Sequence, residues 1–178
     1  INNNRFAEAE IQLKILTDAN INDDKVSILK NELDIKKESY YWQKTNEFEK
    51  KLNETPSDEK IILELADIYA RKKNFEKALI ILSHFKENYS PSEKLLYNYA
   101  IISSWAGDLQ TSYSETNKLL NKNPGNTNYQ LLLGKLLVWM NKDLNKAQTY
   151  LEYVLSKNPE EYDALLSMSL LHLQKKEM

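Results

Sequence analysis

The stretch from Leu96 to Pro124 reads LYNYAIISSWAGDLQTSYSETNKLLNKNP, and it has the form of one helical hairpin. An apolar segment leads into Gly107-Asp108, which signals a turn because glycine tolerates a positive φ. A second amphipathic segment follows and ends at Pro124, a residue that cannot continue a helix. The stretch therefore predicts two helices joined by a short turn.

The same pattern recurs along the chain. The four prolines, Pro56, Pro91, Pro124 and Pro159, are separated by 35, 33 and 35 residues. Independently of proline, small residues recur at steps of 34 or 35, and these are Ala66, Ala100 and Gly134 on the first helix and Ala78, Ser112 and Ala147 on the second. Small residues let two helices approach closely while bulky neighbours fill the groove between them. The extra residue of the longer step falls in the turn NKDLN, where the preceding copy has GDLQ.

This helix–turn–helix unit resembles the tetratricopeptide repeat, whose period is 34 residues. The resemblance covers three consecutive copies, at residues 58–91, 92–126 and 127–160. In the middle copy the motif's usual Trp–Leu–Gly–Tyr start is degraded to Leu–Tyr–Ala–Ser. The resemblance implies an all-α fold, a right-handed superhelix of antiparallel helical hairpins in which each hairpin stacks on its neighbours. We expect about ten helices, no strand, and a single solenoid over residues 1–178.

The flanking segments extend the repeat outward. Residues 24–57 are expected to form one more hairpin, with Val26, Leu29, Leu33 and Ile35 on its first helix and Tyr41, Phe48 and Leu52 on its second. Residues 1–23 and 161–178 are expected to be a lone second helix and a lone first helix. Leu166, Leu170, Leu171 and Leu173 are poor material for the polar cap of a solenoid. We therefore expect that the parent protein continues C-terminally or that a partner covers this end.

Composition argues against several classes of function. The chain has 178 residues, a net charge of −2 and no cysteine, and its lysines and acidic residues are interspersed. This differs from the basic stripe of a nucleic-acid-binding protein. No apolar run approaches the roughly 20 residues of a membrane span. His84 and His172 lie more than two repeats apart, and no nucleophile motif or metal-ligand spacing occurs. We expect no enzyme, no cofactor and no metal.

The resemblance also implies where a ligand binds. In the family, the first helices line the concave face, where extended peptides or partner helices lie. Carrying those positions over gives one column of Leu29, Leu63, Tyr97, Leu131 and Leu166, and another of Lys37, Arg71, Trp105, Trp139 and Gln174, with Lys60, Asp67, Lys94, Asn128 and Lys135 beside them. The candidate binding residues are Leu63, Arg71, Lys94, Tyr97, Trp105, Leu131, Lys135 and Trp139. Two interpretations of Trp105 and Trp139 stay open: they anchor a ligand, or they only pack against the neighbouring repeat.

Three functions follow as hypotheses. The leading one is a scaffold that binds a protein or peptide partner in the concave groove. The second rests on residues 97–115 and 131–166, which resemble repeats that precede the outer-membrane barrel of bacterial exopolysaccharide export proteins; there the first helix often ends in Leu-x-Trp. This implies a periplasmic domain that binds glycan or synthase components, with Trp105 and Trp139 as sugar-stacking platforms. The third is an accessory repeat that only spaces other domains.

Overall fold

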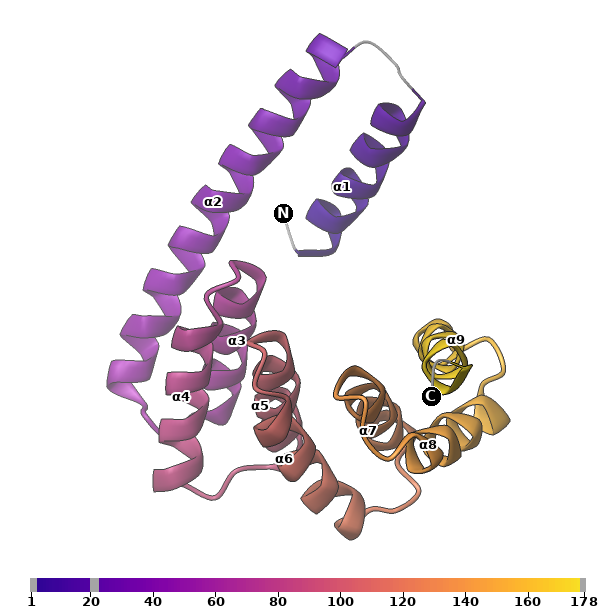
Figure 1. Cartoon of the computed structure of the whole chain (residues 1–178). Coiled ribbons are helices and arrows are strands. Elements are labelled where there is room, and N and C mark those ends of the chain that lie inside the picture. The colour runs from indigo at the N-terminus through magenta and orange to yellow at the C-terminus, as the bar shows by residue number, and fades with distance from the viewer. Residues whose placement is uncertain (1–2, 20–22, 177–178) are drawn as a thin grey trace. The chain divides into compact units, whose positions relative to one another are not determined.

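The computed structural model describes residues 3–19 and 23–176, and within these ranges the chain forms nine α-helices and no strand (Figure 1). The helices are α1 (Asn3–Asp18), α2 (Asp23–Glu54), α3 (Glu59–Arg71), α4 (Phe75–Asn88), α5 (Glu93–Trp105), α6 (Leu109–Lys122), α7 (Thr127–Trp139), α8 (Leu144–Lys157) and α9 (Tyr162–Lys176). The prediction of an all-α fold is confirmed. The chain divides into two compact units, residues 1–56 and 57–178.

The second unit consists of three hairpins, α3–α4, α5–α6 and α7–α8, followed by α9 (Figure 1). Each first helix has 13 residues and each second helix has 14. A side-chain oxygen accepts a backbone N–H of the first turn in all six, and the capping residues are Asp58, Asn74, Ser92, Asp108, Asn126 and Asp143. Short polar side chains of this kind satisfy amide groups that have no partner within the helix. The sequence thus marks where each helix begins.

The turn inside each hairpin has the same geometry. The second residue after the first helix adopts a positive φ in all three repeats, at Lys73 (57°), Gly107 (87°) and Asn141 (50°). In the middle repeat the N–H of Gly107 donates to Ser104 O at 3.1 Å, and that of Asp108 donates to Ser103 O at 2.9 Å. This pair of bonds is the Schellman motif, which satisfies the last carbonyl groups of a helix. The turn after α7 has one residue more, so the extra residue of that repeat lies in a loop, as expected.

The small residues mark where the two helices of a hairpin touch. All six are buried, and they are Ala66, Ala100 and Gly134 on the first helices and Ala78, Ser112 and Ala147 on the second. A Cβ atom added at Gly134 would lie 2.8 Å from both Cγ and Cδ2 of Leu151. Such contacts are closer than carbon atoms tolerate, so α7 and α8 approach as closely as the glycine allows. The predicted packing role of these positions is confirmed.

The contacts between repeats show which helices form the inner face. Successive first helices touch one another, α3 with α5, α5 with α7 and α7 with α9. Among the described residues, no Cα atoms of α4 and α6, or of α6 and α8, lie within 8 Å of each other. These second helices meet through longer side chains: Lys86 forms an ion pair with Glu115 at 3.3 Å, and Lys146 Nζ donates to the Tyr113 hydroxyl at 3.3 Å. A stack that is closer on one side curves toward that side, so the first helices line the concave face of the second unit.

The hairpin expected over residues 24–57 is wrong, because α2 runs without interruption for 32 residues. Its sequence contains neither glycine nor proline, so nothing ends the helix at the expected turn. Ile35, expected on the apolar stripe, is 69% exposed, whereas Val26 and Tyr41 are buried. Nine helices replace the expected ten for this reason. That residues 1–178 form one continuous solenoid stays a prediction.

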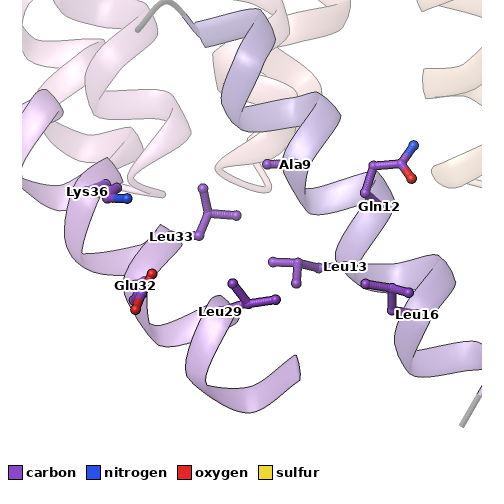
Figure 2. A pocket seen from close by; sticks show the side chains of 8 residues that line it. All are labelled: Ala9, Gln12, Leu13, Leu16, Leu29, Glu32, Leu33 and Lys36. Atoms are coloured by element: carbon purple, nitrogen blue, oxygen red, sulfur yellow. The ribbon is translucent and has the colours of Figure 1, made fainter. Parts of the chain in front are cut away.

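The first unit is the pair of α1 and α2. The ring of Phe6 meets that of Tyr40 edge-on, with centroids 5.5 Å apart, and Lys37 forms an ion pair with Glu10. Farther along the pair, an open cavity of about 320 Å³ lies between the helices (Figure 2). Figure 2 shows Leu13 of α1 and Leu29 and Leu33 of α2 pointing into this space. The two helices are therefore packed tightly at Phe6 and loosely near Leu13.

Candidate functional site

All eight predicted binding residues lie on the first helices of the second unit. Leu63 and Arg71 are on α3, Lys94, Tyr97 and Trp105 are on α5, and Leu131, Lys135 and Trp139 are on α7. Residues four apart on a helix share a face, so Tyr97 and Trp105 face the same side, as do Leu131, Lys135 and Trp139. All eight therefore lie on the helices that line the concave face.

Five of the eight residues line one cavity of about 200 Å³ between α5, α7 and the start of α9. We call it the tryptophan pocket, and its lining residues are Tyr97, Ile101, Ser104, Trp105, Leu131, Leu132, Lys135, Trp139 and Asp163. The two tryptophans reach it from successive repeats because they are 34 residues apart. The structure thus brings together residues that the sequence relates only by the repeat distance.

Each tryptophan is partly supported and partly open. Trp105 is 56% exposed, and its ring meets that of Phe75 with centroids 6.4 Å apart. Trp139 is 45% exposed, and the Lys135 ammonium lies 5.4 Å from the centre of its ring. Packing against neighbours therefore accounts for only part of each indole surface. That the rest contacts a ligand stays a prediction.

The polar groups of the tryptophan pocket bond within the chain. Lys135 forms an ion pair with Asp163 of α9. The Tyr97 hydroxyl donates to the backbone oxygen of Asn128 at 3.2 Å, and the Ser104 hydroxyl donates to Ile101 O at 2.7 Å. Burial, together with the neighbouring Tyr129, raises the pKa of Tyr97 to about 12, so this phenol stays neutral at physiological pH. The larger part of the pocket's lining is apolar, and the charges of Lys135 and Asp163 balance each other.

Two of the other three predicted residues, Leu63 and Lys94, line a neighbouring hollow between α3 and α5, with a volume of about 210 Å³. We call it the polar hollow, and its lining residues are Leu63, Glu64, Asp67, Lys94 and Asn98. Arg71 lies beside it, where its Nε donates to Asp67 Oδ2 at 2.7 Å. Seven of the eight predicted residues therefore line two cavities of different chemistry, one repeat apart, and Arg71 lines neither.

Sequence reasoning missed Ile101, Ser104, Leu132 and Asp163. Ile101 lies one turn from both Tyr97 and Trp105, so helical spacing alone was enough to find it. Asp163 follows Lys135 by 28 residues, an offset that the repeat distance does not reveal.

The outer members of the two predicted columns line neither cavity. Lys37 pairs with Glu10 inside the first unit, and Gln174 donates to Val138 O at 3.1 Å. Leu29 lines the cavity between α1 and α2, and Leu166 is exposed on α9.

Within residues 3–19 and 23–176, no three histidine or acidic side chains are grouped so that they could hold a metal ion. Of the helices described, none combines the length and the apolar character that a membrane crossing needs.

Comparison with known proteins identifies the fold. No protein-family model matches the chain, and no curated protein matches its sequence. Solved structures do match. A tetratricopeptide repeat protein from Parabacteroides merdae has a TM-score of 0.63 and 15% identity over 97% of this chain and 60% of that one. The present chain thus spans about three fifths of that protein's length.

Two further similar structures are of peptide-binding proteins. YrrB, a tetratricopeptide repeat protein with an unusual peptide-binding site, has a TM-score of 0.66 and 14% identity over 83% of this chain and 75% of that one. The second such domain of human RPAP3, in complex with an HSP70 peptide, has a TM-score of 0.55 and 14% identity over 62% of this chain and 92% of that one. At these identities the likeness shows fold alone. The three hairpins of the second unit have the fold of the right-handed α-solenoid of tetratricopeptide repeats.

Proposed function

We propose that this chain is a protein-interaction scaffold whose concave face binds an extended segment of a partner protein. The observation that carries the proposal is the tryptophan pocket, where residues of two successive repeats meet and both indole rings remain about half exposed. Half-exposed aromatic side chains in a concave site are typical binding anchors, because they bury much area at a small cost in conformational entropy.

Two further observations support this role. YrrB and the RPAP3 domain, which share the fold, are described with a peptide-binding site and a bound peptide. In the tryptophan pocket, Lys135 and Asp163 pair with each other and the Ser104 hydroxyl bonds to a backbone oxygen, so none of these groups is placed as a free base or nucleophile. We infer binding without catalysis.

The experiment is a selection of displayed peptides on the immobilised chain, followed by affinity measurements on three variants. Trp105→Ala and Trp139→Ala are expected to weaken a selected peptide by about thirtyfold, which corresponds to roughly 2 kcal/mol for a buried aromatic anchor. Trp42→Ala is the matched control, because Trp42 is 65% exposed on α2 and lines neither cavity. We expect it to bind as the unaltered chain does.

The proposal fails if the two groove variants keep their helix content and bind selected peptides with unchanged affinity. In that case Trp105 and Trp139 are packing residues. A loss of binding in Trp42→Ala of the same size would also count against it, because that change lies outside the groove.

The alternative is a polysaccharide-handling domain of an export machine in the periplasm. The two exposed tryptophans one repeat apart favour it, since indole rings can stack on sugars. Titration with exopolysaccharide oligomers, such as alginate or cellulose fragments, tests this function on the same variants. Saturable glycan binding that needs both tryptophans, with no peptide selected, would favour the alternative. A secretion leader in the gene upstream of this segment would agree with it.

A further inference from the structure

We propose that the tryptophan pocket takes one bulky apolar side chain of the bound segment and disfavours charged side chains and sugars. This inference rests on the proposed function and names the chemistry of its ligand. It follows from the shape of the pocket, the state of its polar atoms and the balance of its charges.

Most of the residues that line the pocket are aliphatic or aromatic. Its aliphatic residues are Ile101 of α5 and Leu131 and Leu132 of α7, and its aromatic ones are Tyr97, Trp105 and Trp139. A volume of about 200 Å³ is below the roughly 300–1,000 Å³ of sites that enclose a whole small molecule. The pocket therefore suits a single side chain projecting from a longer segment.

The hydroxyl groups of the pocket already donate hydrogen bonds within the chain. Tyr97 donates to the backbone of Asn128 and Ser104 to that of Ile101, so neither proton is free for a ligand. A buried sugar needs partners for its own hydroxyl groups, and a buried hydroxyl without a partner is costly. An apolar side chain makes no such demand, so it fits these walls better than a glycan does.

The charges of the pocket cancel each other. Lys135 pairs with Asp163 while its ammonium lies over the Trp139 ring, and only 21% of the Lys135 side chain is exposed. An incoming carboxylate would meet an ammonium whose charge Asp163 already balances, and an incoming cation would be placed beside Lys135. Either ligand loses hydration without meeting an uncompensated opposite charge, whereas an apolar side chain leaves the ion pair in place.

The test uses the whole chain labelled with 15N and follows its three indole N–H signals during titration with small probes. The apolar probes are N-acetyl-leucinamide and N-acetyl-phenylalaninamide, and the comparison probes are N-acetyl-argininamide, N-acetyl-aspartic acid amide and maltotriose. We expect the apolar probes to shift the Trp105 and Trp139 signals saturably at millimolar concentration and to leave Trp42 unmoved. The comparison probes should bind at least tenfold more weakly. The proposal is overturned if any of them binds as tightly as the leucine probe.

A single variant, Asp163→Asn, tests the charge balance separately. It leaves the Lys135 ammonium without its partner carboxylate, so we expect N-acetyl-aspartic acid amide to bind at least tenfold more tightly than it binds the unaltered chain. Unchanged binding of that probe, with helix content preserved, would show that the ion pair does not disfavour anions and would contradict the inference.

The outcome also separates this inference from the proposed function. If selected peptides need both tryptophans but their essential residue is charged, the scaffold role stands and the apolar preference is wrong. If the leucine probe binds but no peptide is ever selected, the pocket chemistry stands and the scaffold role is wrong.

Discussion

The three hairpins have different residues at the same positive-φ turn position, so the cost of a side chain there can be compared between repeats. Lys73, Gly107 and Asn141 are 34 residues apart, and each has the positive φ that closes its first helix. A side chain with a Cβ is strained there, whereas glycine is not. The perturbation is an exchange of residues between two repeats, Lys73→Gly and Gly107→Lys. We expect the first variant to be more stable than the parent and the second to be less stable.

The magnitude follows from two opposing contributions. Relief of the left-handed conformation is worth about 1–2 kcal/mol. The greater freedom of glycine in the unfolded chain offsets roughly 0.5–1 kcal/mol of this. The net gain for Lys73→Gly is therefore about 1 kcal/mol, and Gly107→Lys should lose a similar amount. A Cβ at Gly107 would meet no atom within 4 Å, so that loss comes from the backbone and not from a clash.

The assay is thermal and urea unfolding followed by circular dichroism. For a chain of this length, 1 kcal/mol corresponds to a change in melting temperature of roughly 2–4 °C. Lys73→Ala is the matched control, because it removes the ammonium near the end of α3 but keeps the Cβ. The reasoning is refuted if Lys73→Gly is no more stable than Lys73→Ala, or if Gly107→Lys melts at the temperature of the parent.

Three other predictions concern the core and the ion pairs of the partly buried Glu115. Ala100→Leu and Ala147→Leu should each lower the free energy of unfolding by about 1–3 kcal/mol, because both alanines are fully buried and a larger side chain overpacks the site. Gly134→Ala should destabilise the parent, because the new Cβ would meet Leu151, but it should stabilise a Leu151→Ala background, where alanine's higher helix propensity remains. Urea unfolding measures both effects. Glu115 is partly desolvated but bonds two lysines, and the net effect lowers its pKa from 4.5. Its stabilising contribution is therefore complete above pH 4.5 and is lost as the pH falls through the lowered folded-state value, so Glu115→Gln should unfold with a smaller dependence on pH in that acidic range. An unchanged acid-unfolding profile in this variant would contradict that prediction.

The repeat part of the fold was predictable because its signals are local and recur in phase. A cap, a turn residue and a small residue occur at the same place in each of three copies, so each copy supports the others. Residues 24–57 lacked the small-residue pair, and the hairpin there was predicted from the position of Pro56 and from two apolar stripes. The apolar side chains of α2 keep helical spacing across the expected turn, from Val26 through Leu33 and Tyr41 to Phe48. A hairpin would break that phase, so periodicity across the turn is the better criterion.

The candidate site was predictable only as a set of positions. The 34-residue period places Trp105 and Trp139 on one face, but it does not reveal which cavity each residue joins. Arg71 has the same repeat position as the tryptophans, yet its partner is Asp67 at the polar hollow. The exposure of the indole rings depends on neighbours such as Phe75, which belongs to the second helix of the preceding repeat. Such contacts need the three-dimensional arrangement of the helices.

Each of the two cavities is lined by an acidic residue and a lysine from neighbouring repeats, 27 or 28 residues apart in the chain. Asp67 and Lys94, 27 residues apart, both line the polar hollow, and Lys135 and Asp163, 28 residues apart, both line the tryptophan pocket. The acidic residue comes first in the chain at the polar hollow and second at the tryptophan pocket. Neighbouring first helices pack about 8–10 Å apart, which an extended segment crosses in about three residues. We therefore expect a partner segment to have an apolar residue and, about three positions away, a polar one. Alanine scanning of a selected peptide would show two sensitive positions at this spacing, whereas a single sensitive residue would mean that the polar hollow takes no part in binding.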